Sequence, residues 1–167
     1  MAHMNDSLNV FLKTAAAAAR SGKPLRVFLG NEASDLDSMV SSILLAWSRG
    51  GESEGLPNVP VMNIPRDDFG LRTEAAWLFA DVGIDVKNLT FLDDLDLGRL
   101  FASKGSRLVL ADHNKLSSAQ AAWAGAVEEI VDHHADENLF PGAKKTMAPV
   151  GSASTLVAEA LFAEGGR

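Results

Sequence analysis

Three short clusters of acidic, amide and imidazole side chains carry most of the chemistry that this sequence offers. They are Asn31 with Asp35 and Asp37, the run Asp112-His113-Asn114, and the run Asp132-His133-His134. The chain contains no cysteine, so any metal must be held by oxygen and imidazole ligands. Such ligands suit Mn, Mg, Co or Zn, and several acids in one cleft are stable only where cations neutralise them. The clusters therefore predict a site for divalent metal ions.

Each cluster can also be explained by a structural role that involves no metal. Ser34 and Asp37 have the spacing of a helix capping box, which on its own explains Asp35 and Asp37 equally well as helix-start residues, and both roles can hold together. A single Asp-His pair is more often an orienting hydrogen bond or part of a surface loop than a metal ligand. Because all three clusters follow apolar runs, the metal site is the stronger interpretation. The pairs Asp67-Asp68 and Asp93-Asp94 are expected to be helix caps.

The apolar pattern predicts helices that alternate with strands along the whole chain. Helices are expected over 5–20, 36–47, 71–83, 97–104, 117–123 and 153–161, with glycines at 50–51 and 165–166 as stops. Strands are expected over 25–29, 59–64, 89–92, 108–111, 129–131 and 146–150, and Pro60 suggests an edge or first-residue position for its strand. This alternation is typical of βαβ units, so we expect a three-layer α/β fold: a mainly parallel sheet of five or six strands, with helices on both faces.

The expected sheet explains how distant residues could form one site. In parallel sheets, ligands bind outside the carboxyl ends of the strands. Strands 25–29, 108–111 and 129–131 each end just before one of the three clusters. Asp35, Asp37, Asp112 and His133 are therefore expected to converge at one edge. Two ions a few ångströms apart, bridged by one aspartate, are a usual device for attacking a phosphoryl group.

Composition narrows the class of protein. A length of 167 residues predicts one domain, and 47% hydrophobic and 22% charged residues are typical of a soluble globular protein. The net charge of -7 argues against a broad nucleic-acid surface, and no apolar run approaches the ~20 residues of a membrane helix. The amino terminus lacks the pattern of a secretory signal, which predicts a cytoplasmic protein. Residues 1–4 are expected to be a cloning remnant and 5–167 the domain; the sequence gives no oligomeric state.

At these clusters the chain resembles the DHH phosphoesterase superfamily, whose naming motif stands here as Asp132-His133-His134. The segment from Gly30 to Ser38 is similar to the branch that holds eukaryotic exopolyphosphatases and prune proteins. Family II pyrophosphatases and the oligoribonuclease branch usually carry histidine and proline where this chain has Asn31 and Ser34. Asn63-Ile64-Pro65-Arg66, Leu71-Arg72-Thr73-Glu74 and the segment Gly151 to Val157 resemble the same branch. The similarity runs from about Leu25 to Leu161.

The resemblance implies a role for each candidate residue. One metal would be bound by Asp35, Asp112 and Asn31, and the other by Asp37, Asp112 and His133, with Asp112 as the bridge. His134, His113 and Asn114 would contact the substrate phosphate or a proton in transit. The candidate phosphate contacts are Arg72, which ranks first, with Lys115, Lys144 and Lys145.

The implied activity is hydrolysis of inorganic polyphosphate or another small phosphoanhydride. Two divalent ions, Mn or Mg with Co or Zn as alternatives, would activate a water molecule that attacks a terminal phosphorus and releases one phosphate at a time. In this superfamily a further aspartate ligand and a closing domain lie beyond the last helix found here. We therefore expect an incomplete catalytic fragment with weak or no activity. The alternatives are a non-catalytic prune-like binding or regulatory module, and a pyrophosphatase, nuclease or cyclic-nucleotide phosphodiesterase of the same superfamily.

Overall fold

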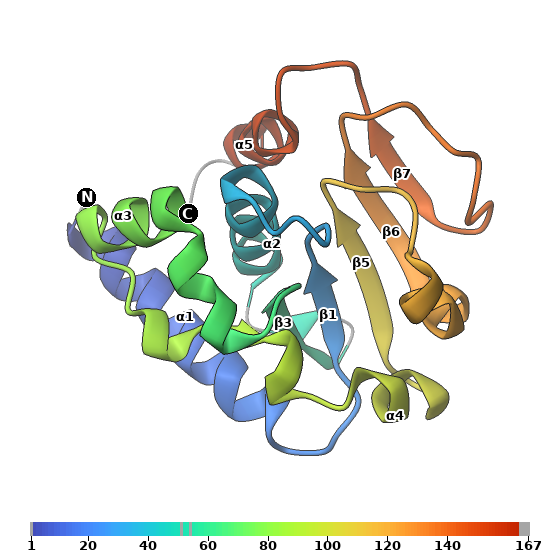
Figure 1. Ribbon diagram of the computed structural model, residues 1–167, viewed down its shortest axis with the longest axis horizontal. Coiled ribbons are helices and arrows are strands. Elements are labelled where there is room, and N and C mark those ends of the chain that lie inside the picture. The colour runs from blue at the N-terminus through green and yellow to red at the C-terminus, as the bar shows by residue number, and fades with distance from the viewer. Residues whose placement is uncertain (1, 51, 54, 164–167) are drawn as a thin grey trace.

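The fold is a parallel sheet between layers of helices, as predicted (Figure 1). The computed structural model describes residues 2–50, 52–53 and 55–163. Its strands are β1 (Arg26–Leu29), β2 (Glu52–Ser53), β3 (Leu56–Met62), β4 (Thr90–Phe91), β5 (Arg107–Ala111), β6 (Val127–Asp132) and β7 (Lys144–Met147). The order across the sheet is β2-β3-β1-β5-β6-β7, with β4 also beside β3. Six strands are parallel, and the short β2 is antiparallel to β3.

Helices on both faces bury the sheet. The α-helices are α1 (Ala2–Ala19), α2 (Leu36–Ser48), α3 (Thr73–Asp81), α4 (Leu97–Ala102) and α5 (Ala153–Ala163). Helix α2 packs on β1, β3 and β5, α1 packs on β3, and α5 lies against α2 and β6. Residues 2–4, expected to be a cloning remnant, form the first turn of α1. Within the described part of the chain, no helix combines the length and apolar character needed to cross a membrane.

The central strands form the core because they are covered on both faces. Val27, Phe28 and Leu29 of β1 are fully buried, as are Leu108 and Val109 of β5. Strands covered on both faces read as continuous apolar runs rather than as an alternating pattern. This pattern explains why β1 and β5 were predicted nearly to the residue.

Several element boundaries differ from the prediction. Strand β3 starts at Leu56, and Pro60 lies inside it, opposite Phe28 of β1, so the predicted edge or first-residue position is wrong. Proline is tolerated there because, among the described residues, β2 pairs only with positions 56–57 of β3 and β4 only with 61–62. The expected helix 117–123 is a 3-10 helix, Ser118–Ala126. Gly51, Gly165 and Gly166, expected as helix stops, lie outside the described residues.

The expected caps at Asp67-Asp68 and Asp93-Asp94 also differ. Residues 67–68 lie within a 3-10 helix (Arg66–Leu71) that has no side-chain cap, and two more short 3-10 helices span Val86–Asn88 and Leu92–Asp94. Asp96 caps α4 by accepting a hydrogen bond from the Arg99 N–H. Asp94 instead accepts the Phe91 N–H at 2.8 Å and pairs with the Arg66 guanidinium at 2.5 Å. Asp94 therefore ties the 3-10 helix that follows β4 to the 3-10 helix that follows β3.

Candidate metal centre

The loop after β1 is shaped by local hydrogen bonds of its own side chains. The Asn31 backbone N–H donates to Ser38 Oγ at 2.6 Å, and a Cβ on Gly30 would lie only 2.4 Å from that oxygen. Glycine is therefore required at position 30. Asn31 Oδ1 accepts the Ser34 N–H at 3.0 Å, which stabilises Ser34 in a left-handed conformation (φ 46°). Asp35 then caps α2 by accepting the Ser38 N–H at 3.0 Å.

Asp37 joins the first cluster to the last helix. Its Oδ2 accepts the Ala153 N–H at 2.8 Å and its Oδ1 accepts the Ser154 N–H at 2.9 Å, so this carboxylate caps α5 rather than its own helix. Burial raises the pKa of Asp37, but these hydrogen bonds and the neighbouring His133 outweigh burial and lower it overall. The carboxylate stays ionised, and its Oδ2 lies 3.9 Å from His133 Nε2.

Asp112 is buried directly after β5, with its backbone in the left-handed region (φ 65°). The Asn31 side-chain amide donates to its Oδ2 at 2.8 Å. Its Oδ1 is buried and has no hydrogen-bond partner among the described residues, yet it lies 3.3 Å from His133 Nε2. Burial, followed by the charges of Asp37 and Asp35, raises the pKa of Asp112 to about 7. The protein alone therefore offsets little of the negative charge of this buried carboxylate.

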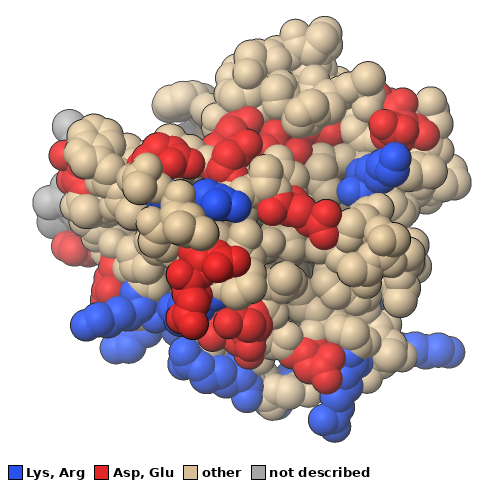
Figure 2. All heavy atoms as spheres, in the orientation of Figure 1, with Lys and Arg blue, Asp and Glu red and all other residues tan. Residues whose placement is uncertain are grey.

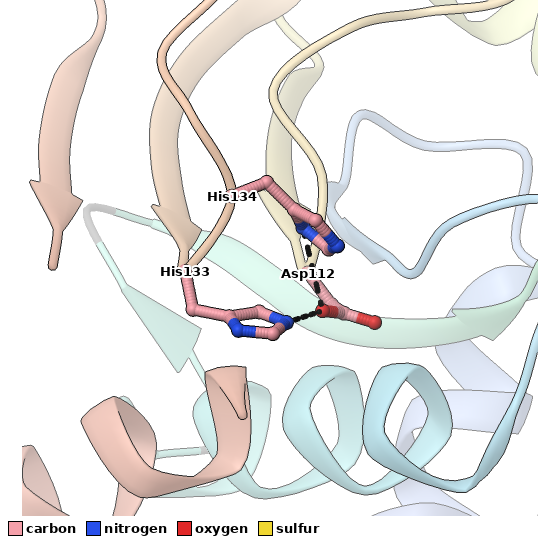
Figure 3. Close-up of side chains that lie close together, drawn as sticks. All are labelled: Asp112, His133 and His134. Atoms are coloured by element: carbon pink, nitrogen blue, oxygen red, sulfur yellow. Dashed lines mark ion pairs between the residues drawn. The ribbon is translucent and has the colours of Figure 1, made fainter. Parts of the chain in front are cut away.

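The two histidines after β6 point toward this carboxylate (Figure 3). His133 Nδ1–H donates to the Val150 carbonyl at 3.0 Å, which leaves the lone pair of Nε2 facing Asp112. His134 Nδ1–H donates to Asp132 Oδ1 at 2.7 Å; this bond raises the pKa of His134, whose side chain is 56% exposed. Ligand atoms of Asp112, His133 and His134 all lie within 4.8 Å of one another.

A buried hydrogen-bond network holds the third cluster in place. Asp132 is fully buried and accepts hydrogen bonds from the backbone N–H groups of His133 and His134 and from the Asn114 amide. Burial raises the pKa of Asp132, and these bonds outweigh it and lower the pKa overall. Asn114 also donates to Ala135 O at 3.0 Å and accepts the Glu137 N–H at 2.9 Å. Asn114 is therefore turned into the protein, not toward a substrate.

The remaining candidates near the loop after β1 are His113, Lys115 and Arg72, and each has different surroundings. His113 Nδ1–H donates to the Ala111 carbonyl at 3.1 Å, and burial lowers the pKa of His113. Exposed Lys115 lines a cavity of about 210 Å³ together with Asn31 and His113. Arg72 Nε donates to the carbonyls of Ala33 (2.9 Å) and Ser34 (3.2 Å), so it fastens the loop that carries Asp35.

Of the two lysines of β7, the structure places Lys144 away from the centre. Lys144 lies beside Glu129, at the opposite end of the strands from His133, and its Nζ is 3.5 Å from the Glu129 carboxylate. Lys145 Nζ makes two hydrogen bonds of 2.8 Å to the carboxylate of Asp136. Both ammonium groups therefore face acidic side chains of the protein.

No role was predicted from the sequence for several residues that support the centre. Ser38, Asn63 and Gln120 are buried polar residues that brace the loop after β1: Asn63 donates to the Gly30 carbonyl at 2.9 Å, and Gln120 donates to Asn63 at 2.9 Å. Asp132 stood inside a predicted motif but was given no role. A buried polar residue with a tertiary partner cannot be distinguished from a surface residue by type alone.

The donor set fits a divalent metal ion. Asp112 Oδ1, which has no hydrogen-bond partner among the described residues, lies beside His133 Nε2, and Asp37 adds a second carboxylate. A ligating histidine normally donates its other ring N–H to a carbonyl or carboxylate, as His133 does to Val150. Asn31 Oδ1 is engaged by the Ser34 N–H, so Asn31 contributes to the centre through the bond that it donates to Asp112.

Comparison with known proteins agrees with this geometry. The DHH family, N-terminal domain, matches residues 27–166. The chain belongs to the DHH family. This DHH domain is 38% identical over 155 residues to exopolyphosphatase PRUNE1 of Rattus norvegicus, covering 91% of the chain and 34% of that protein. It is 33% identical over 146 residues to a putative exopolyphosphatase of Schizosaccharomyces pombe, covering 85% of the chain and 37% of that protein.

A solved structure shares the fold. The crystal structure of a putative family II inorganic pyrophosphatase from Methanococcus jannaschii matches with a TM-score of 0.55 and 21% identity, over 83% of this chain and 39% of that one. At this identity the likeness speaks for the fold alone. The chain spans about a third of the length of the curated relatives named above.

Proposed function

We propose that this DHH domain is the metal-binding domain of a phosphoanhydride hydrolase whose substrate is inorganic polyphosphate. The observation that carries the proposal is the buried Asp112 carboxylate, whose Oδ1 has no hydrogen-bond partner among the described residues and lies 3.3 Å from His133 Nε2. The relatives named exopolyphosphatase support the choice of substrate class.

Asp112 would bridge two divalent ions, Mn or Mg. Asp35 would complete one position, held by the loop that Asn31 and Arg72 brace, and Asp37 with His133 would complete the other. Bound there, the ions would lower the pKa of a water molecule and stabilise negative charge on phosphoryl oxygens.

The side chains around these ligands would bind substrate and move a proton. His134 is held by Asp132 through Nδ1, so its exposed ring presents Nε2 toward solvent, where it can donate to a phosphate oxygen. Lys115 is exposed beside Asn31 and is the lysine best placed to contact a phosphate. Asn114 and Arg72 act as positioning residues, because their polar atoms bond within the protein.

Calorimetry with Mn tests the metal site directly. Wild-type protein is expected to show saturable binding, and Asp112→Asn and His133→Ala should each weaken it at least by the roughly 10- to 100-fold that outer-shell changes produce. Asp67→Asn is the matched control, because Asp67 is an exposed acid on the 3-10 helix Arg66–Leu71, and it should bind like wild type. Traces without metal heat in any of the proteins would refute the proposal.

Phosphate release then tests the activity. Tripolyphosphate, pyrophosphate, short RNA and a cyclic nucleotide are compared at equal concentration with Mn. Release from tripolyphosphate that disappears in Asp112→Asn supports the proposal. Faster turnover of RNA or of the cyclic nucleotide would assign the domain to a phosphodiesterase instead.

A further inference from the structure

The edge of the sheet opposite the metal centre is rich in basic side chains. Strands β1, β5 and β7 begin with Arg26, Arg107 and Lys144, and Arg49 directly follows α2. Figure 2 shows Lys and Arg gathered along the lower rim of the molecule, beneath the starts of the strands in Figure 1. We call this rim the basic edge; its members are Arg20, Lys23, Arg26, Arg49, Arg99, Lys104, Arg107 and Lys144.

Three adjoining cavities lie along the basic edge. The first, of about 440 Å³, is lined by Arg20, Lys23 and Arg99. The second, of about 410 Å³, is lined by Lys104 and Arg107, and it shares Ser103 and Ser106 with the first. The third, of about 300 Å³, is lined by Arg26, Arg49 and Lys144 together with Glu128 and Glu129. Because Arg26 and Arg107 are register partners on β1 and β5, the second and third cavities are also neighbours.

Two glutamates hold the arginines of the third cavity in position. A bulge in the pairing of β5 with β6 leaves Glu128 as an extra residue, and its carboxylate lies 2.5 Å from Arg26 Nε and 3.4 Å from Arg107 Nε. Without it, the two neighbouring guanidinium groups would repel each other. Glu129 lies 2.8 Å from Arg49 and 3.5 Å from Lys144. The two glutamates therefore hold these basic side chains close together in fixed positions.

The charge of this edge is opposite to that of the rest of the chain. Eight of the 15 basic residues line the three cavities, with only four of the 22 acidic residues, Asp94, Asp96, Glu128 and Glu129. Helix dipoles favour Arg20 and Arg49, which directly follow α1 and α2. They do not account for the basic residues that begin three strands.

We propose that the basic edge is a second binding site, which holds a distant part of a long inorganic polyphosphate chain while its end reaches the metal centre. The identity of the ligand rests on the proposed function; the existence of an anion site does not. Along β5, Asp112 lies five positions after Arg107, a path on the order of 17 Å, so one phosphate group cannot occupy both places.

Other polyanions fit this edge less well. Binding of single-stranded nucleic acid uses exposed aromatic rings for stacking, whereas the aromatic side chain that lines these cavities, Phe101, is half-buried against Trp123. Membrane surfaces are bound with the help of exposed apolar side chains. The exposed large apolar residues of the described chain lie outside the three cavities; they are Val10, Leu71, Trp77, Leu139 and Phe162.

The test is binding of long-chain polyphosphate in the presence of a metal chelator, so that the metal centre does not contribute. Lys23→Gln/Lys104→Gln removes two exposed cations of the basic edge, and Lys13→Gln/Lys87→Gln makes the same charge change at exposed positions outside the cavities. We expect the first variant to weaken binding at least ~3-fold and to flatten the salt dependence, whereas the second changes affinity less than ~1.5-fold.

The remaining arms separate this site from the proposed function and from other partners. Asp112→Asn should bind polyphosphate like wild type, and Lys23→Gln/Lys104→Gln should hydrolyse tripolyphosphate like wild type. Binding without any hydrolysis leaves the basic edge intact and refutes only the catalytic proposal. Equal loss in both double variants, tighter binding of a single-stranded oligonucleotide or of anionic vesicles, or salt-sensitive self-association without polyphosphate binding would overturn the inference.

Discussion

Asp112 combines features that a protein rarely tolerates without a functional reason. It has a left-handed backbone, a buried carboxylate with one unpaired oxygen, and Asp35 and Asp37 as acidic neighbours. Conformations of this kind cost on the order of 1–3 kcal/mol and cluster at functional sites. The carboxylate oxygens of Asp37 and Asp132, by contrast, all accept hydrogen bonds. A left-handed backbone and an unsatisfied carboxylate oxygen therefore coincide at the residue that would bridge the metals.

Gly30 illustrates a steric requirement next to this site. In Gly30→Ala the new Cβ would meet Ser38 Oγ at 2.4 Å and the Ser38 carbonyl oxygen at 3.1 Å. We expect destabilisation by about 1–3 kcal/mol, measured by chemical denaturation, because the loop must shift. Gly98→Ala is the control: its Cβ would come no closer than 3.4 Å to another atom, and alanine in α4 should be neutral or stabilise by up to about 1 kcal/mol. Equal effects of the two changes would contradict the steric explanation.

Asn114 tests whether a motif residue is catalytic or structural. Asn114→Ala removes a 2.5 Å hydrogen bond to the buried Asp132 and leaves the Glu137 N–H without its acceptor. We expect a loss of about 1–3 kcal/mol in the free energy of unfolding. His134→Ala should cost much less, because its side chain is largely exposed. If Asn114→Ala unfolds like wild type but abolishes phosphate release, Asn114 has the catalytic role that its motif implied.

At the scale of elements, the metal centre depends on a contact between two helices. Asp37 lies in the first turn of α2 and caps the start of α5, more than a hundred residues away along the chain. Helices α2 and α5 also pack against each other. The same two hydrogen bonds therefore hold both the candidate ligand Asp37 and the start of α5 in place.

Removing this cap should loosen α5 selectively. In metal-free Asp37→Ala, we expect faster hydrogen exchange over 153–163, by about fivefold for each kcal/mol of local stability lost. Loss of a cap typically costs about 0.5–2 kcal/mol. Asp35→Ala is the comparison, because Asp35 caps α2 through Ser38 and should change exchange at the start of α2 instead. Identical exchange maps for the two variants would exclude the cross-helix cap.

Sequence patterns predicted the strands and the edge of the sheet where the three clusters meet. Continuous apolar runs such as 27–29 and 108–111 identify buried strands, and topology brings their carboxyl ends together. The cap from Asp37 to α5, the inward orientation of Asn114 and the remote position of Lys144 could not be predicted in the same way. Each depends on a tertiary partner or on strand register, which no local pattern encodes.

For the molecule as a whole, we expect the acidic residues of the metal centre to lower the stability of the metal-free fold. In Asp112→Asn, the remaining side-chain oxygen can still accept the hydrogen bond from Asn31, and the new amide can donate to His133 Nε2, which lies 3.3 Å from Asp112 Oδ1. The change also removes a buried carboxylate from beside Asp35 and Asp37. In chelator, the variant should therefore be more stable than wild type by about 1–2 kcal/mol, a rise in Tm of roughly 2–4 °C per kcal/mol for a chain of this size.

Metal should reverse this order. Wild-type protein gains about 2.7 kcal/mol at a metal concentration of 100 times its Kd, whereas a variant that binds metal about 100-fold more weakly gains only about 0.4 kcal/mol. Thermal unfolding of both proteins along a Mn titration should therefore show two Tm curves that cross. Parallel curves would mean that Asp112 does not bind metal, and a variant less stable than wild type in chelator would mean that the Asp112 carboxylate supports the fold. Curves that cross would show that Asp112 lowers the stability of the metal-free domain and also binds the metal.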